Sequence, residues 1–171
     1  NNLNALGKLS VKELMSKFKG IGQVKAIIIN AALELGKRRG SSDPVQRPEI
    51  RSSHDTFRLL YPLLCDLPHE ELWVLLLNRS SQVIEKVKIS QGGTGETSAD
   101  LRLILKAAIS ALATNIILCH NHPSGSIRPS REDDQLTQRL KDAARQVDIN
   151  LLDHIIIGDG SYYSYSDEGK L

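Results

Sequence analysis

Asn115-Ile116-Ile117-Leu118-Cys119-His120-Asn121-His122 is followed, after seven further residues, by Ser130-Arg131-Glu132-Asp133. The apolar residues Ile116–Cys119, preceded by Asn115, predict a short buried strand over 115–119. Such a strand ends just before His120 and brings His120 and His122 to one edge of a sheet. Their side chains then point the same way, because side chains alternate along an extended chain. Two imidazoles on one side of a strand can bind the same ion.

Zinc is the metal that this set of residues favours. Zinc prefers about four tetrahedral ligands, and a hydrolytic site keeps one position for water. His120, His122 and Asp133 supply the other three, if Pro123 and Gly125 bend the chain back towards the histidines. Zinc in such a site lowers the pKa of a bound water from about 15.7 towards about 7. The other interpretation is that Ser130 and Asp133 only form a capping box at a helix start. Both can hold together, because a capped helix start is a rigid place for a ligand.

A general base is the next requirement of a hydrolytic site. Glu70 and Glu71 are the candidates, because they open an apolar strand predicted at 70–77. Strand alternation sends these two glutamates to opposite faces, but both faces of the strand are apolar, so periodicity does not choose between them. The alternative is that both are solvated residues in front of a strand.

The order of the other elements predicts an α/β domain in which a mixed sheet is flanked by helices. The predicted helices are 53–64, one whose apolar face includes Leu101, Ile104, Leu105, Ala108 and Leu112, and 130–147. The predicted strands are 70–77, 83–89, 115–119, 151–157 and 162–165. Cys119 and His154 are expected in the core, with His154 hydrogen-bonded, and His54 and His69 at the surface.

A small helical module is expected in front of this domain. Residues 11–18 and 24–39 have helical spacing on either side of Gly20-Ile21-Gly22, and the polar, turn-rich stretch from Gly40 to Pro48 predicts a linker. We therefore divide the chain into 1–46 and 47–171. The sequence begins without methionine and almost inside a periodic segment, so we expect the first module to be truncated.

The metal pattern resembles a known motif. A glutamate followed by His-x-His-x7-Ser-x-x-Asp is similar to the JAMM metalloprotease motif, and the frame around it resembles bacterial RadC proteins over nearly the whole chain. That frame comprises His120–Gly125, Pro129–Asp133 and Leu152–Gly158. A departure is Leu101-Arg102-Leu103, where RadC proteins usually have a Pro-Arg-Glu type helix start.

The resemblance implies a JAMM and cytidine-deaminase-like architecture and a zinc metallopeptidase that hydrolyses amide or peptide bonds. It implies His120, His122 and Asp133 as zinc ligands and Ser130 as a donor to the oxyanion. RadC proteins carry a glutamate eight positions before the Asp or Asn that ends the first strand, which from Asn78 selects Glu70 as the base. Deaminase chemistry is not expected, because the Pro-Cys-x-x-Cys pair is missing.

The first module resembles the helix-hairpin-helix region of RadC proteins. In that motif the amides of Gly20 and Gly22 face a phosphate backbone, and Lys19 and Lys25 add positive charge. Residues 1–51 carry ten Lys/Arg against four Asp/Glu, which favours a polyanion. The alternative function is therefore a DNA-associated, repair-related protein whose zinc domain is a scaffold. The simpler interpretation is that the glycines only allow a tight turn. A zinc-bearing domain without turnover is a third option.

The lengths of the apolar runs and the number of cysteines predict where the protein is located and which partners it has. Apolar runs are far shorter than the roughly 20 residues of a bilayer span, so no membrane partner is expected. Two cysteines 54 positions apart, Cys65 and Cys119, predict no disulfide framework and favour a reducing compartment, the cytoplasm. The expected substrate is a peptide or protein that the sequence does not identify.

Overall fold

The structure, a computed structural model, describes residues 2–43, 46–92 and 100–171. The chain divides into two compact units, Asn1–Gln46 and Arg47–Leu171. No helix within the described residues combines the length and the apolar composition needed to cross a membrane.

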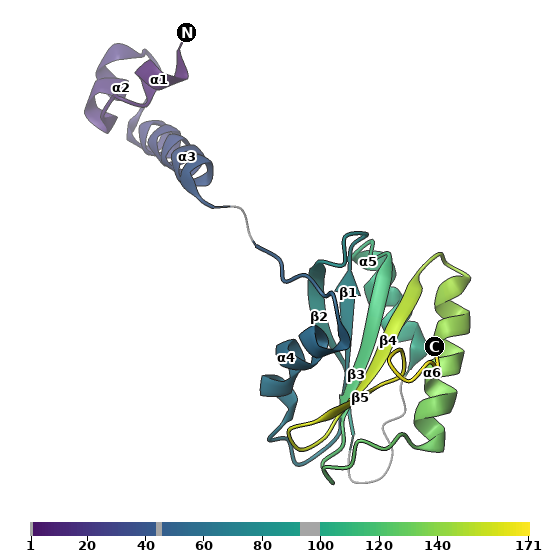
Figure 1. Cartoon of the computed structure of the whole chain (residues 1–171). Coiled ribbons are helices and arrows are strands. Elements are labelled where there is room, and N and C mark those ends of the chain that lie inside the picture. The colour runs from purple at the N-terminus through teal and green to yellow at the C-terminus, as the bar shows by residue number, and fades with distance from the viewer. Residues whose placement is uncertain (1, 44–45, 93–99) are drawn as a thin grey trace. The chain divides into compact units, whose positions relative to one another are not determined.

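The first unit contains α1 (Leu3–Leu6), α2 (Val11–Lys17) and α3 (Gln23–Ser41), drawn in purple and blue in Figure 1. A capping box between Ser10 and Glu13 starts α2. The chain then turns at Gly20, whose φ of 85° lies in the left-handed region that favours glycine. Helices α2 and α3 pack against each other, and the buried residue of each is Leu14 in α2 and Ala26 in α3. The predicted helix, turn and helix are therefore present.

The second unit is built on a mixed sheet. Its described strands are β1 (Glu71–Leu77), β2 (Val83–Gln91), β3 (Asn115–Asn121), β4 (Asn150–Ile157) and β5 (Tyr162–Ser164). They are ordered β2-β1-β3-β4-β5 across the sheet. Strand β3 pairs antiparallel with β1 and parallel with β4. The central position of β3 explains why its side chains are buried on both faces.

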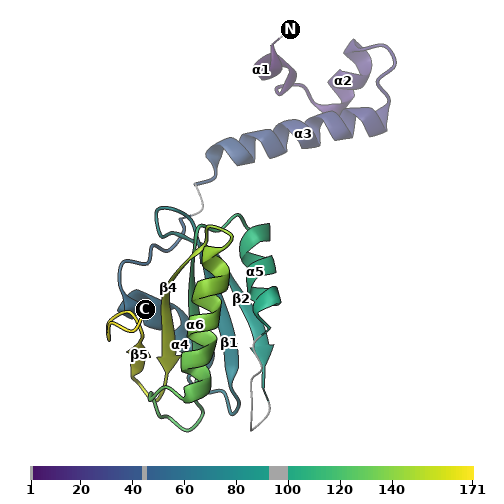
Figure 2. The same ribbon diagram turned by 90° about the vertical axis from the view of Figure 1, so that its right-hand side faces the viewer.

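Helices cover both faces of this sheet (Figures 1 and 2). They are α4 (Ser53–Leu64), α5 (Leu101–Ser110) and α6 (Arg131–Arg145). Strand residues such as Val74 and Leu118 pack with α5 and α6 on one face, and Leu75 and Cys119 pack with α4 on the other. Because side chains alternate along β1 and β3, these strands contribute residues to two separate apolar clusters, one on each face of the sheet. The predicted fold class, a mixed sheet flanked by helices, is confirmed.

Several sequence-based boundaries were wrong. Strand β1 begins at Glu71 and not at Glu70, β2 runs to Gln91, and α6 ends at Arg145. Strand β3 does not end at Cys119 but continues through His120, which pairs with Leu72 on one side and Ile156 on the other. Backbone pairing with both neighbours extends the strand although its last two residues are polar. Leu112 does not belong to the apolar face of α5: it lies beyond the helix end with a φ of 51° and is 84% exposed.

Candidate metal centre

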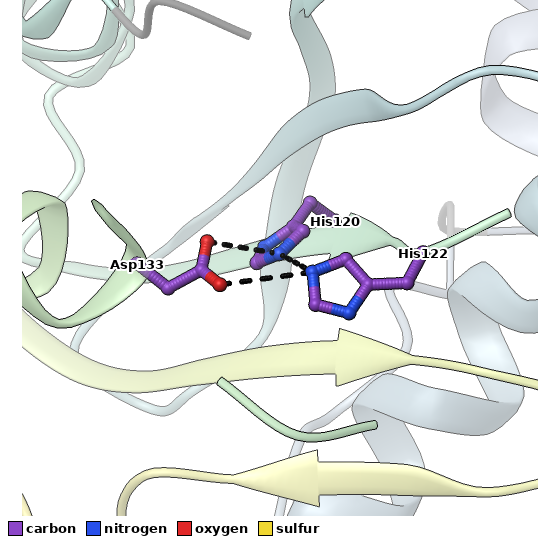
Figure 3. A group of neighbouring side chains, drawn as sticks. All are labelled: His120, His122 and Asp133. Atoms are coloured by element: carbon purple, nitrogen blue, oxygen red, sulfur yellow. Dashed lines mark hydrogen bonds and ion pairs between the residues drawn. The ribbon is translucent and has the colours of Figure 1, made fainter. Parts of the chain in front are cut away.

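Three side chains meet at the end of β3 (Figure 3). His120 is buried at the end of the strand, and the N–H of His122 donates to the carbonyl of Ile157 on β4. His120 Nε2 lies 3.0 Å from His122 Nε2 and 3.1 Å from Asp133 Oδ1. His122 Nε2 lies 3.6 Å from Asp133 Oδ2. The predicted His, His and Asp residues are therefore brought together.

The start of α6 holds Asp133 in this group. Ser130 caps the helix: its hydroxyl oxygen accepts from the Asp133 N–H at 3.1 Å, and Asp133 Oδ2 accepts from the Ser130 N–H at 2.8 Å. The capping interpretation of Ser130 and Asp133 is thus confirmed, and the capped carboxylate also faces the histidines. The Ser130 hydroxyl donates its proton to Asp133 Oδ2 at 2.7 Å.

A backbone carbonyl fixes the tautomer of His122. Its Nδ1 lies 2.8 Å from the carbonyl oxygen of Ser126, which has no proton to give, so Nδ1 is the donor. The opposite nitrogen, Nε2, then presents a lone pair to Asp133 and His120 when the ring is neutral. The loop that carries Ser126 packs closely against Gly158, the residue after β4. A Cβ on Gly158 would lie only 2.3 Å from the carbonyl oxygen of Gly125.

Behind His120 lies a second imidazole. His154, on β4, is fully buried, and its Nε2 lies 2.8 Å from His120 Nδ1. Its other nitrogen, Nδ1, is 2.6 Å from the hydroxyl of Thr137 on α6. The expected hydrogen-bonded core histidine is confirmed. Burial holds the pKa of His154 well below its usual value, because a charged ring is poorly solvated there.

The charges of the group favour an ionised carboxylate. Burial acts to raise the pKa of Asp133, but the contacts with His120 and His122, whose Nε2 atoms donate to the carboxylate when the rings are protonated, outweigh it and hold the pKa well below its usual range. The hydrogen bond to Asp133 raises the pKa of His122 in turn. Two imidazole nitrogens and one carboxylate oxygen, all within 4.8 Å of one another, form a ligand set that zinc and related transition metals accept. The group can hold a metal ion.

Glu70 and Glu71 have different environments. Glu71 is buried, and its carboxylate bonds Trp73, His69 and Lys88 at 2.9–3.1 Å. Glu70 is half-buried, and its charge contributes to the raised pKa of His122. Leu72 lies opposite His120. This is the last pair between the two strands: Glu70 lies just before β1 and His122 just after β3, close enough for the charge of Glu70 to act on the imidazole.

His69 does not lie at the surface as expected. The His69 side chain is half-buried, because its Nε2 contacts Oε1 of the buried Glu71 at 3.1 Å. His54 is exposed, as expected, and Cys119 is fully buried in the core.

Asn121, between the two histidines, is a site residue that the sequence did not reveal. Its side chain is buried on the opposite face of β3, where Oδ1 accepts from the Glu71 N–H at 2.8 Å and Nδ2 donates to the His69 carbonyl at 2.9 Å. It therefore clamps the backbone on both sides of Glu70. Its position inside His-x-His was the only signal, and the pattern leaves that residue type open.

Comparison with known proteins identifies the family. The model of the RadC-like JAB domain matches residues 50–170, which is nearly the whole second unit. The chain belongs to the RadC-like JAB domain family. JAB domains are generally metal-dependent hydrolases, so the family agrees with a metal-accepting ligand group at the end of β3.

Relatives of this RadC-like protein extend the match to the first unit. A UPF0758 protein of Flavobacterium johnsoniae is 49% identical over 168 residues, which cover 98% of this chain and 73% of the relative. A UPF0758 protein of Porphyromonas gingivalis is 49% identical over 172 residues, covering 100% of this chain and 76% of the relative. A UPF0758 protein of Streptococcus sanguinis is 39% identical over 168 residues, which cover 98% of this chain and 74% of the relative. Their names state no activity.

Proposed function

We propose that the protein is a zinc-dependent metallopeptidase that hydrolyses an amide or peptide bond. The observation that carries the proposal is the convergence of His120 Nε2, His122 Nε2 and the Asp133 carboxylate within 4.8 Å. Such an arrangement of lone pairs and one negative charge is costly without a cation, and it matches the three-ligand sets of hydrolytic zinc sites. Zinc bound there would supply Lewis acidity and lower the pKa of a water molecule.

The protein's own groups would carry out the remaining steps. Glu70 is the proposed general base, which takes a proton from the attacking water and returns it to the leaving amine. The effect of its charge on the pKa of His122 supports this role, because it puts Glu70 near the ligand group, whereas Glu71 lies buried with its carboxylate bonded to Trp73, His69 and Lys88. The Ser130 hydroxyl is the proposed donor to the oxyanion. It now donates to Asp133 and must turn to serve the substrate.

The substrate is proposed to be a peptide or protein. The thiols of Cys65 and Cys119 are both free, which supports a reducing compartment such as the cytoplasm.

Cleavage of a peptide and isopeptide library, followed by mass spectrometry, tests this function. The zinc-loaded protein should cleave members of the library, the protein stripped by a chelator should not, and added zinc should restore cleavage. Glu70→Gln should lose at least about 100-fold in kcat while keeping its zinc. Glu85→Gln, at an exposed glutamate on β2, is the matched control and should cleave normally. Cleavage that survives Glu70→Gln would overturn the proposal for the base.

A second candidate function, DNA association, is favoured by the hairpin of the first unit. Helix α3 begins at Gln23, with Gly22 as an N-cap that offers no side-chain hydrogen bond and with no acidic residue in its first turn. Its free N-terminal amides and helix dipole suit a phosphate group. Lys19 is exposed beside this turn, and Lys25 Nζ donates to the Gly20 carbonyl at 3.2 Å. We propose a weak contact with DNA that does not depend on its sequence.

Fluorescence anisotropy with a labelled DNA duplex tests this candidate. Binding should weaken as salt increases, should disappear when Lys19 and Lys25 are both changed to Ala, and should survive Glu70→Gln. A variant with Lys86 and Lys141 both changed to Ala, at exposed lysines on β2 and α6, is the control for loss of two positive charges. Equal binding by the double variant would exclude the hairpin as the contact.

A further inference from the structure

A buried chain of polar groups connects α6 to the metal group through two strands. Thr137 of α6 contacts His154 of β4, and His154 contacts His120 of β3. Thr137 and His154 are 3% and 0% exposed, so water does not compete with these contacts. The proton positions along the chain can therefore be assigned from the groups themselves.

The first proton is fixed by a backbone carbonyl. Thr137 Oγ1 lies 2.7 Å from the carbonyl oxygen of Asp133. A carbonyl has no proton, and two oxygens at this distance require one between them, so the threonine hydroxyl donates to Asp133. Its single proton is then used. The 2.6 Å contact to His154 must be donated by the Nδ1–H of the imidazole.

The second proton follows from burial of the imidazole. The ring of His154 stacks on Tyr165, with ring centroids 5.0 Å apart, and lies in a fully buried position. Burial favours the neutral ring. A neutral imidazole with a proton on Nδ1 has a bare Nε2, which accepts across the 2.8 Å contact from His120 Nδ1–H. His120 Nε2 is then left with its lone pair directed to Asp133 and His122.

We propose that His154 and Thr137 are positioning residues that fix the tautomer of His120, and that His154 is not a fourth ligand. This inference rests on the proposed metal site. Histidine ligands commonly donate their second N–H to a carbonyl or a carboxylate. His122 does so through Ser126, whereas His120 uses an imidazole and a hydroxyl, which add no negative charge to the core. The reverse orientation would place a proton on His120 Nε2, where the metal must bind.

Nitrogen-15 NMR of the imidazoles tests the assignment directly, because the shifts distinguish protonated from bare ring nitrogens. The metal-free protein should show His154 with a protonated Nδ1 and a bare Nε2, and His120 with a protonated Nδ1. A protonated His154 Nε2 would overturn the proposal. The measurement needs neither zinc nor substrate. If these tautomers are found and the protein binds no zinc, the proposed function fails and the tautomer assignment stands.

Zinc affinity, measured by competition with a chromophoric chelator, tests the consequence. His154→Phe should weaken zinc binding about 10- to 100-fold. His154→Gln should recover most of that loss, because an amide oxygen can accept from His120 Nδ1. Thr137→Val should weaken binding and Thr137→Ser should not. His54→Phe, at an exposed histidine, is the control.

Thermal unfolding of each variant separates positioning from loss of fold. The proposal requires that affinity follow the hydrogen bond among variants of similar stability. Equal affinity of His154→Phe and wild type would overturn it, as would equal losses in His154→Phe and His154→Gln.

Discussion

Asn121 contributes to the site by holding main chain rather than by facing the metal. Its amide satisfies a buried N–H and a carbonyl on either side of Glu70. A single side chain of β3 therefore sets the position of the proposed base relative to the two histidines, which leave the same strand on the other face. This arrangement links the base and the ligands through one short segment.

Asn121→Ala should separate the positioning of Glu70 from the binding of metal by the histidines. It leaves two backbone groups without partners, which costs about 1–3 kcal/mol each when they are buried. We expect reduced stability and a lower kcat, with zinc content close to wild type, because the amide touches no proposed ligand. Urea denaturation and metal analysis check this. Asn150→Ala, which removes an exposed amide pair with Asn115, is the control. Loss of zinc in Asn121→Ala would contradict the account.

Glu71→Gln should reveal a structural role. Burial acts to raise the pKa of Glu71, but hydrogen bonds from Trp73, His69 and Lys88 outweigh it and hold the pKa below its usual value of 4.5. A carboxyl with a depressed folded pKa stabilises the fold above its unfolded pKa, and this contribution is lost as pH falls through the folded pKa. Urea denaturation should show Glu71→Gln less stable at pH 7 by about 1–3 kcal/mol, with a smaller deficit below pH 4. A deficit that does not change with pH would count against this explanation.

At the scale of elements, two helices begin with the same device. Ser52 and Asp55 cap α4, and Ser130 and Asp133 cap α6, each with a complete capping box. In α4 the box only starts a helix. In α6 the same geometry also directs a carboxylate to the histidines, so the helix start and the metal group share one residue.

The two caps provide a matched pair of substitutions. Ser52→Ala and Ser130→Ala should each lower the free energy of unfolding by about 1 kcal/mol. Ser130→Ala alone should also weaken zinc binding and lower kcat, because Asp133 loses two hydrogen bonds with the Ser130 side chain. Denaturation and chelator competition on both variants check this. Equal zinc affinity in the pair would show that the cap does not orient Asp133.

The turn after β4 positions the loop that carries His122. A methyl group on Gly158 would lie 2.3 Å from the carbonyl oxygen of Gly125 and 2.7 Å from Ile127 Cγ2. Gly158→Ala should therefore displace this loop, loosen the contact between Ser126 and His122, and weaken zinc binding. Chelator competition measures the effect. Gly36→Ala, at a helical glycine with open space around it, should bind zinc normally. An unchanged affinity of Gly158→Ala would show that the loop adapts.

The ends of strands and helices show where prediction from the local sequence failed. The apolar pattern ended the central strand at Cys119, although pairing continues to His120 with β1 and to Asn121 with β4. Polar residues at a strand end carry no local signal of such pairing. Leu112 fitted the spacing of α5, but the chain leaves the helix before it and turns with a positive φ. Periodicity alone does not detect such a helix end.

For the whole molecule, the fold class and the metal group were predictable because their signals are local. Buried strands and amphipathic helices have their own periods, and His-x-His with Ser-x-x-Asp lies within fourteen positions. The order of the strands was not predictable from the sequence, and neither were the supporting roles of Asn121, Thr137 and His154. Their roles depend on partners supplied by other elements, so no spacing along the chain encodes them. His154 in particular was expected in the core, but its contact with His120 spans 34 positions.

Metal content of the whole chain tests the central claim most directly. The protein purified without chelator should contain about one zinc per chain by mass spectrometry, and zinc should raise its unfolding temperature because it binds only the folded state. Glu70→Gln should keep the metal, since the proposed base is no ligand. His120→Ala should contain none and should show no thermal shift with zinc. Equal zinc in His120→Ala and wild type would contradict the account.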